Sequence, residues 1–347
     1  MPVVNNVLAT VLSVQQEVTR IIKRFKFEEL ESAVMSLFPE ISWSNIRSEL
    51  VKHHNSFTSA NVAQLIRTVI TDRNIKEKDL KDRLATLQLI DISWHSDRRT
   101  WYGHLLQGSS TYISYFKHRK ILVDMQDYFN SLHMKINVKM YIHNGVTYIA
   151  LISKEDNQRK KKIRSGLPIT FALFMGQKCF FSNRKNVSQD MLQAIVQSTG
   201  YGKSKQINLA GKNLVSLSKM CWRRKQRALN FENVNNTVEY KDSGPERKAS
   251  GIDFTQHKQR KKYAENCFGD NPATLELLVI NGYNMPFAHE DISKRLPNES
   301  TSAKWEYRSP NITGLLTKLI EQRILVTPVP YYVSNLMVLG KNEFTIS

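Results

Sequence analysis

Apolar side chains near the start of the chain recur three and four residues apart, which is the spacing along one buried face of an α-helix. This spacing joins Val18, Ile21, Ile22 and Phe25. It returns over residues 27–38 and ends at Pro39, because proline cannot continue a helix. The same spacing predicts further short helices at residues 42–53, 58–71 and 78–89. Residues 1–103 are therefore predicted to form a compact helical bundle.

Alternation of apolar and polar residues begins near residue 136 and indicates half-buried β-strands. Two such strands, 136–142 and 146–152, enclose Asn144-Gly145, which favours a hairpin turn because both residues tolerate positive φ. Further elements are predicted as strands at 167–174 and 178–182 and helices at 113–132 and 189–197. Residues 104–231 are therefore predicted to be an α+β domain with an antiparallel sheet.

The last third of the chain begins with a stretch, 232–262, that is poor in apolar residues and rich in Asn, Lys, Ser and Gly. This composition predicts a linker or a long loop. The remaining residues, 263–347, contain a predicted strand at 275–280, a helix at 312–322, and short strands near 325–328 and 336–339. We expect them to form a smaller C-terminal α+β domain.

Charge is distributed unevenly along the chain. The 347 residues include 50 Lys and Arg against 31 Asp and Glu, and the net charge of +19 attracts a polyanion such as nucleic acid or an anionic membrane. Residues 151–227 hold 17 basic and 3 acidic side chains, whereas residues 228–347 hold 14 of each. A concentrated basic block collects phosphates and releases their counterions. We therefore expect duplex DNA to bind mainly to the middle of the chain.

The basic residues expected to contact DNA lie in several short clusters, and we predict that folding brings these clusters into one groove. They are Arg20, Lys23, Arg24, Arg98, Arg99, Lys117, Arg119, Lys120, Arg159, Lys160, Lys161, Lys162, Arg164, Arg184, Lys185, Lys203, Lys205 and Lys212. The run at 159–162 also fits a nuclear import signal, and any single lysine can be an ordinary solvated charge. The neutral C-terminal domain is expected to hold a protein partner instead.

No catalytic or cofactor-binding motif is recognisable in the sequence. Gly200-Tyr-Gly-Lys-Ser204 resembles part of a P-loop, but Gln197 stands where that motif requires a glycine, so a turn that presents Lys203 and Lys205 is the better interpretation. The histidines lack metal-ligand spacing, and the basic block has few carboxylates for a metal-dependent nuclease. We expect no metal, cofactor or small-molecule substrate and a non-enzymatic function. The alternative is a nucleic-acid-processing enzyme with an unrecognised active site.

Membrane association and disulfide-dependent folding are both disfavoured by the sequence. No apolar run approaches the roughly 20 residues that a membrane-spanning helix requires, and no basic amphipathic helix shows an exposed aromatic face. The three cysteines, Cys179, Cys221 and Cys267, are far apart and odd in number. They favour a reducing compartment such as the nucleus or the cytosol.

Several short segments resemble the centromere protein N family of the inner kinetochore. They are Glu246-Arg-Lys-Ala-Ser-Gly-Ile-Asp-Phe254, Glu265-Asn-Cys-Phe-Gly-Asp270, Ser309-Pro-Asn-Ile-Thr-Gly-Leu-Leu316, Arg20-Ile-Ile-Lys-Arg24 with Glu29-Leu30, and Arg98-Arg-Thr-Trp101. The resemblance extends over most of the chain in the order of its elements. It implies a pyrin-like helical domain, then an α+β domain shared with centromere protein L, and then a C-terminal segment that pairs with that protein.

The resemblance also implies a location and a set of contacts. Members of the family bind the centromeric nucleosome within the constitutive centromere-associated network, so the implied location is the nucleus, at the centromere and kinetochore of the chromosome. Residues that match DNA contacts of the family are Arg20, Arg24, Arg99, Arg184, Lys185 and Lys212, and the loop at 159–164 is basic in the family too. The family reads a histone loop with acidic residues, whereas Leu12 and Gln16 stand at those positions here. Recognition of the centromeric histone variant is therefore not implied.

Overall fold

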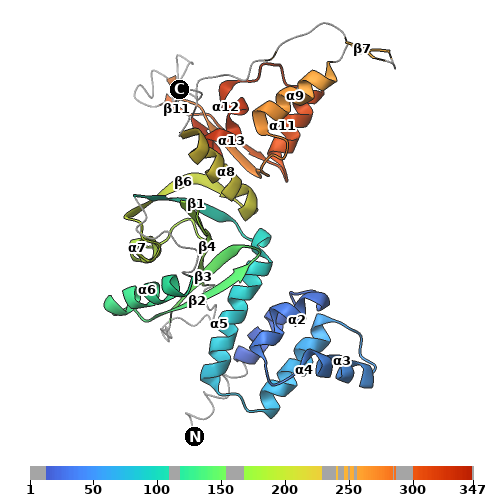
Figure 1. Ribbon diagram of the computed structural model, residues 1–347, viewed down its shortest axis with the longest axis vertical. Coiled ribbons are helices and arrows are strands. Elements are labelled where there is room, and N and C mark those ends of the chain that lie inside the picture. The colour runs from blue at the N-terminus through green and yellow to red at the C-terminus, as the bar shows by residue number, and fades with distance from the viewer. Residues whose placement is uncertain are drawn as a thin grey trace. The chain divides into compact units, whose positions relative to one another are not determined.

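A computed structural model of the chain describes residues 13–108, 118–153, 168–228, 240, 246–248, 251–253, 256–283, 285–286 and 300–345. The chain divides into two compact units, whose elements are labelled in Figure 1. The first unit comprises residues 1–96, 109–175 and 188–201, and the second comprises residues 97–108, 176–187 and 202–347. Both units contain helices and antiparallel strands, which confirms the α+β class.

The first unit begins with short helices at most of the predicted places. They are a helix described over residues 13–22, the 3₁₀-helices η1 (Phe27–Glu29) and η2 (Met35–Leu37), and the α-helices α2 (Leu30–Ala33), α3 (Trp43–Lys52), α4 (Ser59–Asp72) and α5 (Glu77–Trp94). Ser42 caps α3, since its hydroxyl oxygen accepts a hydrogen bond from the amide of Asn45 at 3.1 Å. Thr58 caps α4 in the same way, through the amide of Asn61 at 3.3 Å. Polar caps therefore set where these two helices begin.

The prediction of one continuous helix over residues 27–38 is wrong, because the structure has the three short helices η1, α2 and η2 there. Val34 separates α2 from η2, and its φ of −114° departs from the helical value. The apolar pattern is nevertheless satisfied, because Leu30, Val34 and Phe38 are all buried. The free energy gained by burying these side chains is thus greater than the loss from interrupting the helix.

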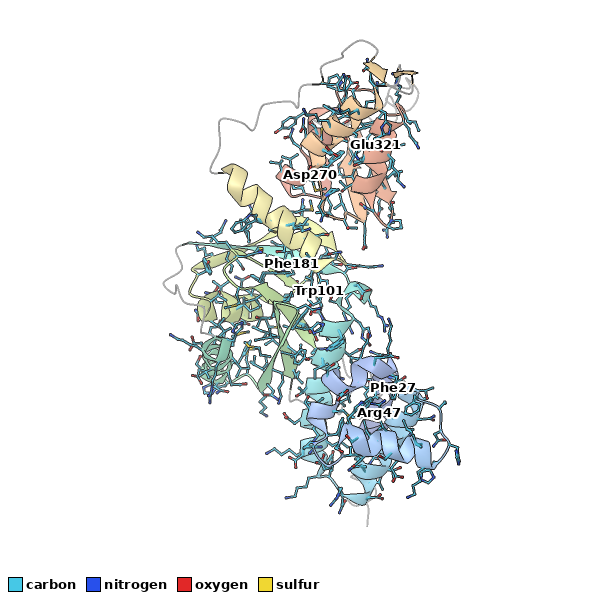
Figure 2. The ribbon with its side chains drawn as sticks, turned by 45° about the vertical axis from the view of Figure 1, so that its right-hand side comes forward. Phe27, Arg47, Trp101, Phe181, Asp270 and Glu321 are labelled. Carbon is cyan, nitrogen blue, oxygen red and sulfur yellow. The ribbon has the colours of Figure 1, made fainter. Side chains whose placement is uncertain are left out.

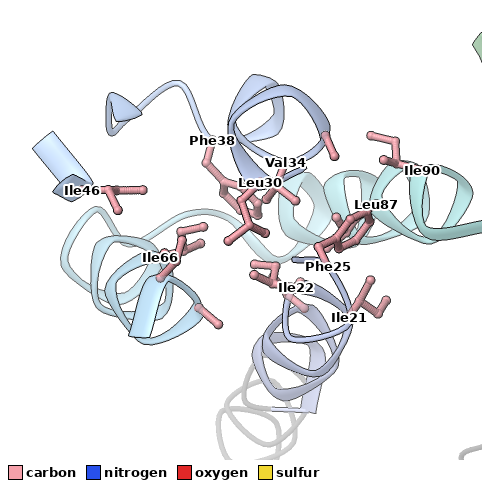
Figure 3. Close-up of a cluster of buried hydrophobic side chains, with 14 of the residues drawn as sticks. Ile21, Ile22, Phe25, Leu30, Val34, Phe38, Ile46, Ile66, Leu87 and Ile90 are labelled. Atoms are coloured by element: carbon pink, nitrogen blue, oxygen red, sulfur yellow. The ribbon is translucent and has the colours of Figure 1, made fainter. Parts of the chain in front are cut away.

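One cluster of buried apolar side chains holds the helices of the first unit together (Figure 3). The labelled members are Ile21, Ile22, Phe25, Leu30, Val34, Phe38, Ile46, Ile66, Leu87 and Ile90. Burying a side chain of this size contributes roughly 1.5–3 kcal/mol relative to leaving it exposed. The residues that predicted the first helix are each at most 2% exposed. The spacing in the sequence therefore identified the true core of this part.

Among its described residues, the first unit also has three antiparallel strands and two further helices. They are β2 (Ile136–His143), β3 (Val146–Ser153), β4 (Ile169–Phe174), α6 (His118–Ser131) and α7 (Gln189–Ser198). The predicted hairpin is confirmed, since His143 pairs with Val146 and the turn residues Asn144 and Gly145 have φ of 49° and 74°. Helix α5 contacts β2 and β3, and its Asp82 accepts a hydrogen bond from Lys139 at 2.7 Å. The helical part and these strands therefore form one unit.

The second unit contains three antiparallel strands in the order β5-β1-β6. They are β1 (Trp101–Gln107), β5 (Cys179–Ser182) and β6 (Lys203–Gly211), and α8 (Leu214–Ala228) packs against β5 and β6. Figure 2 labels Trp101 and Phe181, which are both fully buried. β5 was predicted, whereas β1 and β6 were not. Neither missed strand shows the regular alternation that marked the others.

The C-terminal part of the second unit is built from short elements. They are β7 (Glu246–Lys248), β8 (Gly251–Asp253), α9 (His257–Phe268), β9 (Leu277–Asn281), β10 (Met285–Pro286), β11 (Ser300–Thr301), β12 (Lys304–Arg308), α11 (Ile312–Glu321), α12 (Tyr331–Ser334), α13 (Leu336–Leu339) and β13 (Glu343–Thr345). β9 lies between β12, which is antiparallel to it, and β13, which is parallel. α9 and α11 pack side by side (Figure 1). β9 and α11 confirm two predicted elements.

Three expectations for the C-terminal part were wrong. α9 begins at His257, inside the stretch expected to be a loop. The strand predicted near 336–339 is the helix α13, and no regular element forms at 325–328. Pro328 and Pro330 lack the amides that a strand ladder requires, which explains the absence of a strand there.

Asn342 joins the C-terminal part to the outer edge of β6. Its backbone amide donates to the carbonyl of Asn208 and its side-chain amide donates to the carbonyl of Ala210, both at 3.0 Å. Its own carbonyl accepts from the amide of Val279 in β9 at 2.7 Å. Asn342 is 5% exposed. A single buried residue thus connects two sheets of the second unit.

Candidate nucleic-acid interface

Five of the predicted DNA contacts gather at one end of the β5-β1-β6 sheet. They are Arg98 and Arg99 before β1, Arg184 and Lys185 after β5, and Lys212 after β6. Because β1 is antiparallel to both neighbours, its start meets their ends. Tyr102 pairs with Ser182 in β5, and Trp101 pairs with Gly211 in β6. Strand register therefore places these five cations together, although they are separated by more than a hundred positions in the sequence.

The loop after β5 has a fixed backbone and exposed side chains. The Ser182 hydroxyl donates to the carbonyl of Arg184 at 2.7 Å, and the Gln206 side-chain amide donates to the carbonyl of Lys185 at 3.1 Å. The side chains of Arg184 and Lys185 are exposed. A loop that is already ordered loses less conformational freedom when it binds an anion.

His104, in the middle strand β1, connects the sheet to this loop. Its Nε2 lies 3.1 Å from the Ser182 hydroxyl oxygen, and its ring stacks on Phe180 with centroids 4.9 Å apart. Because the Ser182 hydroxyl donates its proton to Arg184, Nε2 must carry a proton and donate to Ser182. Burial lowers the pKa of His104 to about 4, so the ring is neutral at pH 7. Its Nδ1 has no hydrogen-bond partner among the described residues.

Lys203 and Lys205 lie towards the other end of the same sheet. Lys203 pairs with Gln107 and Lys205 with Leu105, near the end of β1. Nine residues of strand, at about 3.3 Å each, separate Lys203 from Lys212 by roughly 30 Å. Both lysines are exposed, but they belong to β6 rather than to the predicted turn. They extend the basic surface along one strand.

The predicted contacts near the first helix of the first unit have different surroundings. Lys23 is exposed. Arg20 forms an ion pair with Glu17 at 2.5 Å. The guanidinium of Arg24 lies 2.6 Å from the carboxylate of Asp91, whose side chain is 6% exposed. Arg24, in the turn that follows the first helix, therefore links this part of the chain to α5 through an ion pair.

The remaining predicted contacts are divided between α6 and segments without a described placement. Arg119 and Lys120 are exposed in the first turn of α6. Lys117, Arg159, Lys160, Lys161, Lys162 and Arg164 lie outside the described residues. The single groove expected from all the clusters stays a prediction.

Sequence reasoning missed a basic surface on α9. Lys258, Lys261 and Lys262 are exposed on this helix. The run His-Lys-Gln-Arg-Lys-Lys at 257–262 was a signal for it. The equal numbers of basic and acidic residues in the C-terminal segment concealed that signal.

Neither a metal centre nor a membrane-spanning helix is found in the part of the chain that the structure describes. Within those ranges, no three His, Cys, Asp or Glu side chains are grouped so that they could hold a metal ion. The helices there are too short or too polar to cross a bilayer. The sequence matches no family model and no curated protein at a significant level.

Proposed function

We propose that the protein is a non-enzymatic subunit of the inner kinetochore that binds the DNA of the centromeric nucleosome. It acts in the nucleus, at the centromere of the chromosome, in kinetochore assembly and in chromosome segregation during mitosis. The proposal is supported by the resemblance to the centromere protein N family and by the basic surface of the second unit. The helical core of the first unit is compatible with the pyrin-like bundle that the resemblance implies.

The observation that carries the DNA-binding part is the group of cations at one end of the β5-β1-β6 sheet. Guanidinium and ammonium groups form charge-assisted hydrogen bonds with phosphate oxygens and release counterions. Such contacts hold a protein on duplex DNA without reading its sequence. If all five cations contact phosphates, the logarithm of the affinity falls with the logarithm of salt concentration with a slope of about −4.5.

The C-terminal part is proposed to pair with centromere protein L and, through it, with other constitutive centromere-associated subunits. β12 is an edge strand of its sheet, and all five of its residues are exposed. Trp305 and Tyr307 are 47% and 52% exposed, and they share one face because they are two residues apart. Exposed aromatic side chains of this kind are enriched in protein interfaces.

Charge reversal in the loop after β5 tests the proposed DNA contact. Arg184→Glu combined with Lys185→Glu is expected to weaken DNA binding severalfold and to leave the fold intact. Both side chains are exposed, and the hydrogen bonds from Ser182 and Gln206 use backbone carbonyls that these substitutions retain. Fluorescence anisotropy of a short labelled duplex measures the affinity, and circular dichroism checks the fold.

A matched control for this variant reverses two exposed charges elsewhere. Arg47→Glu in α3, labelled in Figure 2, with Lys78→Glu in α5 makes the same change in net charge. It is expected to alter the affinity little. Equal losses in the two variants would show an effect of net charge alone, and unchanged binding in the loop variant would remove the loop from the contact surface. A cleaved or modified product in the presence of magnesium or manganese would contradict the non-enzymatic part.

A further inference from the structure

The exposed face of α9, in the second unit, carries three lysines. Lys258, Lys261 and Lys262 are all exposed, at relative positions i, i+3 and i+4. At 3.6 residues per turn, these positions lie within an arc of roughly 100°. The opposite face is packed in the core, where Tyr263 and Cys267 are 3% and 4% exposed. The helix therefore holds the three ammonium groups on one side, facing solvent.

No ion pair holds these lysines, because no carboxylate oxygen of a described residue lies within 4.0 Å of any of the three ammonium groups. Glu265 follows one turn later on the same face, and Asp270 lies beyond the opposite end of the helix (Figure 2). The first turn of α9 contains no acidic residue. Lys258 lies in the first turn of α9, where a positive charge opposes the helix dipole, so the folding of α9 does not explain this lysine.

The arginine of the same run has a structural contact instead. The Arg260 guanidinium lies 5.6 Å from the centre of the Tyr240 ring, and Arg260 is only partly exposed. The Tyr240 hydroxyl donates to the side chain of Gln256, just before the helix, at 2.7 Å. Arg260 therefore stabilises the start of α9, and the three lysines remain for an external ligand.

We propose that Lys258, Lys261 and Lys262 form a second phosphate-binding surface, which contacts the sugar–phosphate backbone of duplex DNA. This inference rests on the proposed function, because it adds a DNA contact in a part of the chain whose net charge is zero. Lysine ammonium groups are compact charges on flexible stems, which suits contact with successive phosphates without base recognition. The C-terminal part then binds DNA as well as a protein partner.

A nuclear import receptor is the competing ligand, because a short run of lysines and arginines also fits an import signal. The observations favour DNA. The run belongs to a folded helix, and Tyr263 and Ala264, which follow it directly, are buried. Arg260 is packed on Tyr240 in the middle of the run. The run is therefore not an accessible extended peptide.

The test replaces the three lysines in the full chain by Lys258→Gln, Lys261→Gln and Lys262→Gln. Anisotropy of a labelled duplex is measured over a range of salt concentrations. The slope of log affinity on log salt is expected to become shallower by roughly 2 to 3, and the affinity at physiological salt to fall severalfold. The matched control is Lys76→Gln, Lys318→Gln and Lys341→Gln, which removes the same charge from three exposed lysines outside α9 and outside the proposed contacts. It is expected to leave both quantities nearly unchanged.

Each other outcome overturns the inference in a distinguishable way. An unchanged slope in the α9 variant removes this helix from the DNA contact, while a loss of binding in the Arg184 and Lys185 variant still supports the proposed function. Equal losses in the α9 variant and its control indicate net charge alone. An unchanged slope together with loss of nuclear import assigns the run to an import receptor. Absence of DNA binding by the unmodified protein overturns the inference and the proposed function together.

Discussion

Asp91→Asn is expected to lower the free energy of unfolding by about 3 kcal/mol, because the change removes one partner of a buried ion pair. The Asp91 carboxylate is 2.6 Å from the guanidinium of Arg24 and 3.1 Å from Nδ1 of His95. An asparagine side chain fills the same space without the charge and turns a hydrogen-bond donor towards one of these groups. Because Arg24 is 31% exposed, it regains some hydration, which keeps the loss near the lower limit for buried pairs.

Urea unfolding of the Asp91 variant, followed by circular dichroism, measures this loss. The matched control is Glu40→Gln, because Glu40 pairs with Arg83 at a site where both side chains are 21% exposed. The hydrogen bond from Arg83 holds the pKa of Glu40 below its usual value, so this pair stabilises the fold until acid protonates the carboxylate. Its removal at pH 7 is expected to lower stability by about 1 kcal/mol. Equal losses in the two variants would contradict the special role of Asp91.

Acid is expected to destabilise the fold through His104, by roughly 3 kcal/mol between pH 6.5 and pH 4. Burial lowers the pKa of this imidazole in the folded protein from 6.5 to about 4. At pH 7 the ring is neutral in the folded and unfolded states alike, and it makes no contribution to pH dependence. Below pH 6.5 the unfolded chain binds a proton that the folded protein does not. Stability is therefore lost as the pH falls, and the loss levels off below about pH 4.

His104→Phe isolates this contribution, because phenylalanine keeps the stacking on Phe180 and cannot be protonated. Unfolding free energies of the variant and the unmodified protein are compared from pH 7 to pH 4. The variant is expected to gain roughly 3 kcal/mol relative to the unmodified protein over this range. Parallel curves would show that His104 is protonated equally easily in both states. The variant also leaves Ser182 without its donor, so its DNA affinity reports whether His104 positions the loop after β5.

The sequence predicts most helices and strands in which the spacing of the apolar residues alone shows which side is buried. Val18, Ile21 and Ile22 identify a helix face, because only a helix brings that spacing to one side. Asn144-Gly145 identifies a turn, because positive φ is accessible to both residues. Such elements are specified locally, and the structure confirms them.

Elements that depend on distant partners are not readable in the same way. β6 has only two buried apolar residues, Ile207 and Leu209, and its lysine-rich start becomes a strand through pairing with β1. Residues 325–328 have strand-like side chains, but Pro328 and Pro330 prevent a ladder. Tertiary pairing and missing amides decide these cases, and neither follows from spacing alone.

In the candidate site, too, some features follow from the local sequence and others depend on distant strand pairing. Arg184 and Lys185 were predicted to contact DNA, which requires exposed side chains, and both side chains are exposed. Their position beside Lys212 follows from the register of β1, which the sequence does not contain. The α9 lysines were overlooked because the net charge of the C-terminal segment is zero and says nothing of where each charge lies. In the folded helix, Lys258, Lys261 and Lys262 gather on one exposed face, which a summed charge does not reveal.

The link made by Asn342 has a consequence for solubility. A strand at the rim of a sheet is a template on which another molecule can add a strand, and repeated addition leads to fibrils. At the rim of β6, the carbonyls of Asn208 and Ala210 already accept hydrogen bonds from Asn342 of the same molecule. These two carbonyls are therefore not available to a strand of another molecule. Strand addition is blocked at that position by Asn342, and no helix is needed to cover the edge.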